Sequence, residues 1–141
     1  MSKPIYIYLA GPLTTGDTLR NIRRAFHVGS ELFDLGYTVF IPHLSAFWDI
    51  IHPTKEVDYE RWMEYDFNWL AKCDMLVRLP GDSSGADREW VFAKKNKIPA
   101  YTLDQFWKKF HPTAKHKTNR SSKSYATRAI SSKAKGLQLI H

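Results

Sequence analysis

Short apolar runs alternate with segments of helical periodicity along this chain, and that alternation limits the fold more than any other feature. The runs that predict strands cover residues 5–10, 37–41, 74–79 and 98–102. The segments that predict helices cover residues 18–35, 59–72, 84–95 and 103–110. Strands that alternate with helices need crossover connections, which produce a parallel sheet with helices on both faces. The sequence therefore predicts an α/β fold, a single-domain doubly wound parallel sheet of the flavodoxin/Rossmann-like kind.

The predicted sheet also locates a binding site. Parallel sheets of this kind bind ligands in the crevice beyond the carboxyl ends of their strands. Three connections would meet there: residues 11–17, the long connection over residues 42–57, and residues 80–85. A connection as long as the second is often a lid or a binding loop. Because this placement suits many functions, the chemistry must be argued from individual residues.

The composition is that of a globular protein without a membrane anchor. Hydrophobic residues make up 43% of the 141 residues, which is enough for one core. No apolar run approaches the roughly 20 residues of a membrane span, and the N-terminus shows no signal-peptide pattern. Cys73 is the only cysteine, so no disulfide can form within the chain, which fits a reducing cytosol. We therefore expect a cytoplasmic protein.

The positive charge of the chain is concentrated at its C-terminal end. Residues 1–110 hold 14 basic and 14 acidic residues, whereas residues 111–141 hold seven basic residues and no acid. The second segment also lacks hydrophobic periodicity and is rich in Ser and Thr. The sequence therefore predicts one domain over 1–110 and a basic, flexible tail over 111–141. Such a tail could contact nucleic-acid phosphates, although a solvated appendage is the simpler interpretation.

Asp66 stands out on the helix predicted over residues 59–72. It is the only acid on the stripe that follows the i, i+3, i+4, i+7 rule, together with Trp62, Met63 and Cys73. A carboxylate that faces apolar surroundings costs several kcal/mol unless it is paired, hydrogen-bonded or protonated. Desolvation would raise its pKa toward that of a proton donor near neutral pH. The structural alternative is a backbone cap, or a pair with an arginine at the domain edge.

A second acid, Glu89, lies near the start of the following helix. Ser84 and Asp87 match a capping box, so we expect the helix to start at Ser84 with Glu89 in its first or second turn. The helix dipole and free backbone N–H groups there favour an ionised carboxylate, which is the form a nucleophile requires. Ser83, Ser84 and the Gly85 N–H would also form an anion-binding end suited to a phosphate. An ordinary acidic first turn is the plain alternative.

Together the two acids suggest one class of reaction. One is expected to be held ionised and the other to be pushed toward its neutral form, as in enzymes that cleave glycosidic bonds with two carboxylates. A retaining reaction needs a nucleophile at the anomeric carbon and an acid that protonates the leaving group, with the carboxyl groups roughly 5 Å apart. Glu89 would be the nucleophile and Asp66 the acid.

Four stretches within residues 5–102 resemble the nucleoside 2-deoxyribosyltransferase superfamily, including its nucleotide N-glycosidase relatives. Residues 8–12, Tyr-Leu-Ala-Gly-Pro, resemble the family's first strand and the glycine-containing loop after it. Asp66 lies eight residues before Asp74, in a helix-to-strand segment like the family's. Residues 83–89, Ser-Ser-Gly-Ala-Asp-Arg-Glu, resemble the family's Ser-x-Gly-x-x-x-Glu, the most specific of the four. The last stretch resembles the family's following helix and strand.

The resemblance implies a role for residues in each stretch. Glu89 would be the nucleophile, Tyr8 would hydrogen-bond to it and orient it, and Asp66 would serve acid–base or sugar-binding roles. Other expected substrate-binding residues are Gly11, Pro12, Ser83, Ser84 and Gly85, together with Trp48, Phe47 or Trp62 as a ring that stacks on the base. Arg88 and Trp90 depart from the family, whose members often carry small or apolar residues beside the glutamate.

The implied reaction is cleavage of the N-glycosidic bond of a 2′-deoxynucleoside or its 5′-monophosphate. A covalent deoxyribosyl-glutamate would form, followed by hydrolysis or by transfer to another base. Ser83 resembles the serine that contacts the 5′-phosphate in nucleotide-cleaving relatives, whereas nucleoside-specific relatives often carry an acid in that region, and Asp82 is adjacent. The implied reaction needs no metal or organic cofactor, and His43 and His52 lack the third ligand at metal spacing that a zinc site would require. The resemblance also implies a homo-oligomer that completes its site from a neighbouring chain.

Two other classes of protein remain open from the sequence. A non-catalytic nucleotide-binding or sensor domain on the same fold would hold its ligand through residues 83–85 without cleaving it. A nucleic-acid-associated protein would act through the basic residues of the tail over 111–141, with a strong dependence on salt. Release of free base from a deoxynucleoside or deoxynucleotide separates an enzyme from both of these alternatives.

Overall fold

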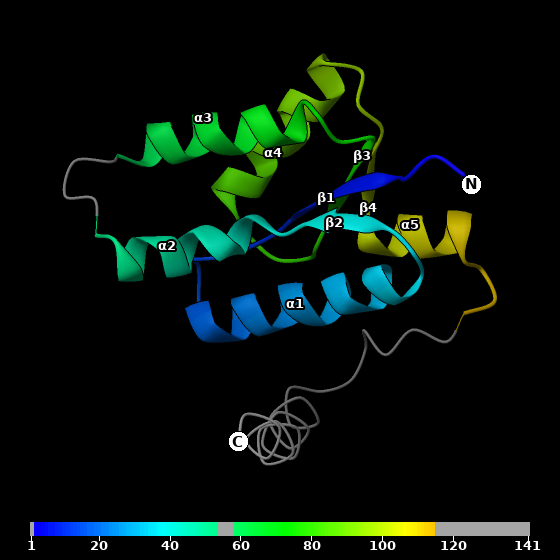
Figure 1. The fold of residues 1–141 in the computed structure, drawn as a ribbon, viewed down its shortest axis with the longest axis horizontal. Helices are drawn as coiled ribbons and strands as arrows, with labels where there is room; N and C mark the ends of the chain where they lie inside the picture. Colours follow the sequence, from blue (N-terminus) through cyan, green and yellow to red (C-terminus); the bar gives the residue numbers. More distant parts are fainter. Residues whose placement is uncertain (1, 54–57, 115–141) are drawn as a thin grey trace, which may run out of the picture.

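A four-stranded parallel sheet with helices on both faces forms the described part of the chain, residues 2–53 and 58–114 of the computed structural model (Figure 1). The strand order is β2-β1-β3-β4, and every neighbouring pair is parallel. The strands are β1 (Tyr6–Ala10), β2 (Thr38–Phe40), β3 (Met75–Arg78) and β4 (Ala100–Thr102). The doubly wound, flavodoxin/Rossmann-like α/β fold predicted from the sequence is confirmed. The predicted tail lies outside the described residues from position 115 onward.

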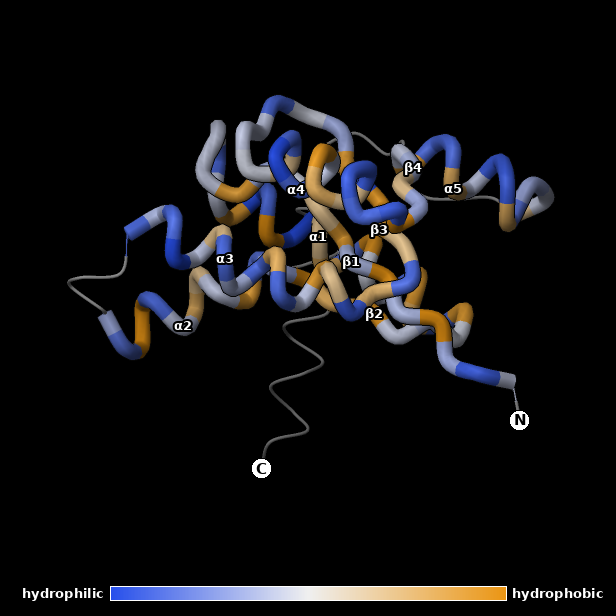
Figure 2. The backbone as a smooth tube through the Cα atoms, turned by 90° about the horizontal axis from the view of Figure 1, so that it is seen from above, coloured by the Kyte–Doolittle hydropathy of each residue, from blue (hydrophilic) through white to orange (hydrophobic). Residues whose placement is uncertain are grey.

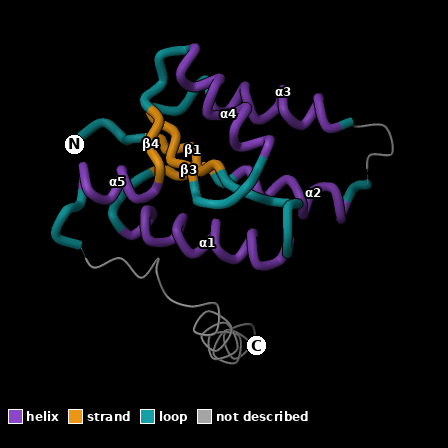
Figure 3. Tube along the Cα trace, turned by 180° about the vertical axis from the view of Figure 1, so that it is seen from behind, coloured by secondary structure: helices purple, strands orange, loops and turns teal. Residues whose placement is uncertain are grey.

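Two helices cover each face of the sheet (Figures 1 and 3). They are α1 (Thr18–Asp34) and α5 (Leu103–Phe110) on one face, and α3 (Tyr59–Leu70) and α4 (Ser84–Lys95) on the other. Local sequence determines where helices begin: the side chains of Asp17 and Asp58 accept hydrogen bonds from the backbone N–H groups of Arg20 and Arg61. No helix within the described ranges is both long and apolar enough to cross a membrane.

The alternation of side chains along β1 divides the core between the two faces. Ile7 and Leu9 pack on the α1 and α5 side, in the same cluster as Phe106. Tyr8 and Ala10 pack on the α3 and α4 side. Small side chains are frequent there: Ala10, Ala86, Ala93 and Ala100. Hydrophobic and hydrophilic segments alternate along the helices, as expected for elements that turn one side to the sheet (Figure 2).

The connection after β2 contains helical structure. The prediction of a long loop over residues 42–57 is therefore wrong for its first part. The chain folds into a 3-10 turn, η1 (Pro42–Leu44), followed by α2 (Ser45–Ile51). No residue of α2 is fully buried, although the structure describes all of them. Aromatic packing joins α2 to α3, because the Trp48 ring lies edge-on to Trp62 and Tyr65 at centroid distances of 5.7 and 5.8 Å. Residues 54–57 lie outside the described ranges.

β1 and β3 are neighbours at the centre of the sheet, and the chain leaves them in opposite directions. From β1 it crosses through α1 to β2 at one edge, and from β3 it crosses through α4 to β4 at the other. The loops after these two strands therefore diverge, and they leave a crevice at the carboxyl ends of the strands. α2 extends beyond the same end of the sheet (Figure 1).

Candidate active site

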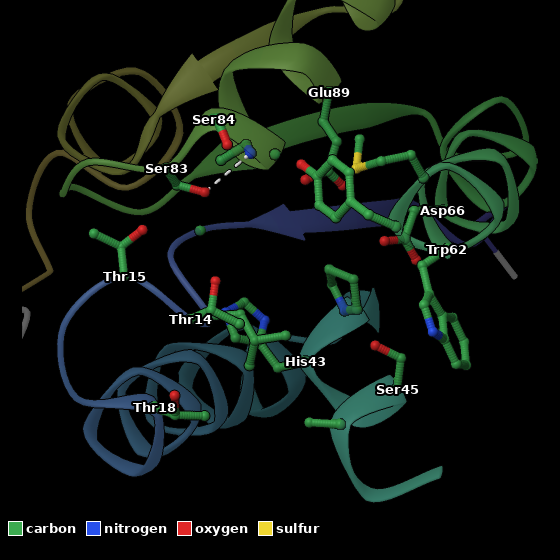
Figure 4. Close-up of a pocket in the computed structure, with 18 of the residues that line it drawn as sticks. Thr14, Thr15, Thr18, His43, Ser45, Trp62, Asp66, Ser83, Ser84 and Glu89 are labelled. Atoms are coloured by element: carbon green, nitrogen blue, oxygen red, sulfur yellow. Dashed lines mark hydrogen bonds between the residues drawn. The ribbon is translucent and has the colours of Figure 1, made fainter. Parts of the chain in front are cut away.

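A cavity of about 450 Å³ lies at this crevice and contains both acids singled out from the sequence (Figure 4). Glu89 lines it from α4, and Asp66 lines it from α3. The remaining walls come from the loop after β1, from η1 and α2, and from the first turn of α4. The condition on which a two-carboxylate mechanism depends, a shared pocket for the two acids, is therefore met.

Glu89 is buried against the sheet and is only 5% exposed. Its Oε2 atom accepts a hydrogen bond from the hydroxyl of Tyr8, at the centre of β1. Burial raises the pKa of Glu89 to about 8; the Tyr8 hydrogen bond and the charge of Arg78 oppose this rise, and the Asp66 carboxylate adds to it. The expectation that the helix dipole keeps Glu89 ionised is therefore wrong, because desolvation outweighs its place near the helix start.

Asp66 meets the expectation of a partly dehydrated acid. It lies on the stripe of α3 whose neighbours Met63 and Leu70 are buried. Burial raises the pKa of Asp66 to about 7. Its Oδ1 atom is buried, and no described residue forms a hydrogen bond with that atom. Such an oxygen at the edge of a cavity can exchange a proton with a bound ligand, and neither a backbone cap nor an arginine partner occupies it in the described part of the chain.

The opposite end of the cavity is rich in hydroxyl groups (Figure 4). Ser83 and Ser84, at the start of α4, lie across from Thr14 and Thr15 in the loop after β1. Each hydroxyl can donate one hydrogen bond and accept others. This end therefore suits the oxygen atoms of a sugar, whereas Trp62 and Asp66 lie toward the other end (Figure 4).

Ser83, not Ser84, is the residue that caps α4. Its Oγ accepts a hydrogen bond from the Ala86 N–H at 3.1 Å. The capping box expected between Ser84 and Asp87 is therefore wrong by one residue, although the first helical residue is Ser84 as expected. The side chain of Asp87 instead accepts a hydrogen bond from Arg78 at 2.7 Å. With its cap one residue earlier, α4 places Glu89 in its second turn.

Two glycines allow the cavity walls to come close together. A Cβ atom on Gly85 would lie 3.1 Å from the hydroxyl of Tyr59, which is tighter than ordinary packing. A Cβ atom on Gly11 would lie 2.9 Å from Cβ of Leu79, so a side chain there would displace the loop after β3. Both glycines line the cavity, and a side chain at either position would meet neighbouring groups of its wall.

His43 is a residue that the sequence interpretation considered only as a metal ligand. It is 1% exposed and lines the cavity. Its Nε2–H donates to the carbonyl of Pro12 at 2.9 Å, and burial lowers its pKa, so the ring is neutral. Nδ1 is then an acceptor, and it has no hydrogen-bond partner among the described residues. No group of three or more His, Cys, Asp or Glu side chains in the described ranges could hold a metal ion.

Two of the predicted substrate-binding residues do not line the cavity. Pro12 supplies the carbonyl that orients His43, and its ring lies beside Gly81, where a Cβ would be 3.0 Å from Pro12 Cγ. Trp48 packs against Trp62, and Trp62 is the ring that lines the cavity. The ring available to stack on a base is therefore Trp62 rather than Trp48.

Residues 5–102, from the residue before β1 to the end of β4, match the family model described as Domain of unknown function (DUF4406). The chain belongs to the DUF4406 family. A comparison with curated proteins finds no match. All the described residues that line the cavity fall inside the matched segment, so they all belong to the DUF4406 domain.

Arg78 fixes the loop that leads into α4 of the DUF4406 domain. It stands at the end of β3 and donates to the carbonyls of Leu79 and Gly81 at 2.8 and 3.1 Å. The same guanidinium pairs with Asp87 at 2.7 Å. Gly81 has a φ of +116°, a conformation that residues with a side chain rarely adopt. Arg78 therefore sets the position of the helix start that carries the cavity hydroxyls and Glu89.

Arg88 and Trp90, which flank Glu89 in the sequence, do not line the cavity. Arg88 forms two hydrogen bonds to Glu60 of α3, at 2.8 and 2.9 Å. Trp90 packs against the sheet-side cluster, and Lys94 lies 5.1 Å from its ring centroid. These two side chains thus join α4 to its surroundings.

Proposed function

We propose that this chain cleaves the N-glycosidic bond of a 2′-deoxynucleoside or its 5′-monophosphate, as members of the nucleoside 2-deoxyribosyltransferase superfamily do. Three of the stretches that resemble that superfamily contribute Gly11, Asp66 and Glu89 to the cavity. The observation that carries the proposal is the arrangement of three groups: Glu89 and Asp66 line one cavity, and Tyr8 donates a hydrogen bond to Glu89. A buried nucleophile with an orienting hydroxyl and a second acid is the arrangement a retaining glycosidase requires.

In the first step, a carboxylate oxygen of Glu89 attacks C1′ of the deoxyribose. The bond between C1′ and the base nitrogen breaks, its electron pair passes to the base, and Asp66 donates a proton to that base. A deoxyribosyl ester of Glu89 results. The Tyr8 hydroxyl, which donates to Oε2, keeps the carboxylate in one orientation and favours its ionised form.

In the second step, the ester is opened by water or by a second base. Asp66, now ionised, accepts the proton of the incoming group, and the electron pair of the ester bond returns to Glu89. Neutral His43 presents its Nδ1 acceptor to the same cavity, where it suits a sugar hydroxyl or a base N–H as donor. The positions of Trp62 and the hydroxyl groups favour a base near α3 and a sugar 5′ end near the start of α4.

The reaction depends on one proton shared by the two acids, which predicts a bell-shaped pH profile. Activity falls at low pH because Glu89 takes up a proton, and at high pH because Asp66 loses its own. Since burial raises both pKa values, to about 8 for Glu89 and about 7 for Asp66, the maximum is expected between these values. Asp66→Asn should slow base release roughly 100-fold and remove the alkaline limb. An unchanged profile would argue against the acid role.

The same proposal includes a homo-oligomer, because α2 exposes apolar side chains beside the cavity. Ile50 lines the cavity yet is 74% exposed, and Ile51 is 70% exposed. A second chain that covers this helix would remove both side chains from water and close the cavity. Light scattering at several protein concentrations tests this part: an assembly supports it, and a monomer at all concentrations contradicts it.

The experiment for the activity itself compares wild-type chain with Glu89→Gln and with the exposed control Glu64→Gln. Each is incubated with the four deoxynucleosides and their 5′-monophosphates, and free base is measured by chromatography. Glu89→Gln should lower base release by roughly a thousandfold or more while leaving the fold intact, because the amide is a poor nucleophile. The control should match wild type. Normal turnover by Glu89→Gln would overturn the proposal, and binding without base release from wild type would favour a non-catalytic nucleotide-binding domain.

A further inference from the structure

The charge of the cavity distinguishes between the two substrate classes that the proposed function leaves open. Three carboxyl groups line it: Asp49 from α2, Asp66 from α3 and Glu89 from α4. The other polar side chains that line it, within the described residues, carry hydroxyls, the neutral imidazole of His43 or the indole of Trp62, and none of them is a cation. Among the described residues this wall offers an anion no positively charged side chain, and whichever of its carboxyl groups is ionised repels an anion.

The arginines nearest the start of α4 are committed to other partners. Arg78 donates to two loop carbonyls and to Asp87. Arg24 donates to the carbonyl of Pro80. Arg88 pairs with Glu60 on the outer side of α3 and α4. Each of these cations thus stabilises the loop or the helix pair behind the cavity wall, and none of the three lines the cavity.

The helix start itself has one of its N–H groups occupied. The Ser83 side chain already accepts a hydrogen bond from the Ala86 N–H, a donor that a bound phosphate would otherwise use. What faces the cavity there is a group of hydroxyls: Ser83, Ser84, Thr14 and Thr15. A hydroxyl of a ligand can both donate to and accept from such groups, which no phosphate dianion can do.

We propose that the substrate is an uncharged 2′-deoxynucleoside whose 5′-hydroxyl, rather than a 5′-phosphate, occupies the hydroxyl-rich end of the cavity. The inference rests on the proposed glycosidic cleavage. It argues against the 5′-phosphate contact that the resemblance at Ser83 implies. A phosphate dianion beside the two acids would raise the pKa of Glu89 further and so oppose ionisation of the nucleophile.

The test compares each deoxynucleoside with its own 5′-monophosphate on wild-type full-length chain, by base release. We expect kcat/KM to be at least about tenfold higher for the nucleoside. Equal or faster cleavage of the monophosphate would overturn the inference. If neither compound releases base, the proposed function fails on its own, and calorimetric binding of the same pairs decides the substrate class: tighter binding of the nucleoside supports it, and tighter binding of the monophosphate, or no binding, overturns it.

A gain-of-function pair tests the electrostatic cause directly. Thr15, which lines the cavity across from Ser83, is replaced by arginine in one variant and by glutamine in a control. Thr15→Arg should raise kcat/KM for the monophosphate roughly tenfold relative to Thr15→Gln, because the two side chains are both long but only one is charged. The calorimetric affinity for the monophosphate should rise in the same way. Equal behaviour of the two variants in both measurements would contradict charge as the basis of selection.

Discussion

The two faces of the sheet are built from alternate residues of the same strands, yet they differ in chemistry. On the α1 and α5 face the cluster is made of apolar side chains, among them Leu9, Leu32 and Phe106. On the α3 and α4 face β1 presents Tyr8, whose hydroxyl meets the buried carboxyl of Glu89. One face thus holds close-packed hydrocarbon, and the other holds an acid together with alanines small enough to admit it.

The difference shows how a small domain accommodates a desolvated acid. Burying a carboxyl group without a full set of partners opposes folding, so the stabilising free energy must come from elsewhere in the molecule. Here it comes from the apolar face, where large side chains such as Leu9, Leu32 and Phe106 pack together. Changes on the first face should therefore alter stability, and changes on the second should alter reaction rate.

The largest expected effect on stability is that of Phe106→Ala. Phe106 is fully buried, and loss of its ring should lower the free energy of unfolding by about 3–5 kcal/mol. The kcat of the protein that remains folded should stay near wild type, because the side chain lies on the face away from the cavity. Urea denaturation and base-release kinetics measure the two quantities. Phe33→Ala, on the same face but at a side chain that is 72% exposed, is the control and should change stability little.

A smaller effect is expected from pH, because the folded chain binds a proton at Glu89 more tightly than the unfolded chain does. The free energy of unfolding should therefore fall as pH rises from about 4.5, the ordinary value, to about 8, and then level off. The Glu89 contribution is on the order of 2–4 kcal/mol across that range. Denaturant titrations at several pH values test it: Glu89→Gln should show a shallower fall, and an identical slope would contradict the burial of this acid.

The smallest of the three effects is that of Tyr8→Phe, which removes one hydroxyl from the second face. Loss of its hydrogen bond should slow base release roughly 10- to 100-fold, while the free energy of unfolding changes by about 1 kcal/mol or less. Since this hydrogen bond opposes the raised pKa of Glu89, which is the higher of the two, its loss should move the alkaline limb of the pH–rate profile to higher pH. A large loss of stability with an unmoved profile would assign Tyr8 to packing alone. Tyr101→Phe, away from the cavity, is the matched control.

Much of the fold was predictable because its signals are local. The strands depend on short apolar runs, and the helix caps at Asp17 and Asp58 depend on residues only a few positions away. The helix α5 occupies the predicted range 103–110. The helix α2 was not predictable in this way. It is short and buries no residue completely, and its packing depends on Trp48 meeting Trp62 from another segment. Periodicity within one segment carries no information about such contacts.

The sequence was enough to single out the two acids of the candidate site, but it was not enough to predict the pKa of Glu89. A motif of seven residues was enough to single out Glu89, and a helical stripe was enough for Asp66. The raised pKa of Glu89 follows from burial against the sheet. The sequence of the helix alone does not show that burial. His43 was missed as a hydrogen-bonding group because its partner, the carbonyl of Pro12, lies 31 residues away. Tertiary contacts decide both features.

The central claim, a covalent bond between deoxyribose and Glu89, is tested most directly by trapping the intermediate. Wild-type chain is mixed with a deoxynucleoside, quenched with acid during turnover, digested and analysed by mass spectrometry. The account predicts that the peptide containing Glu89 gains the mass of one deoxyribosyl group, and that Glu89→Gln yields no such adduct. Turnover with the adduct on another residue, or with none under conditions that preserve a glycosyl ester, would contradict it.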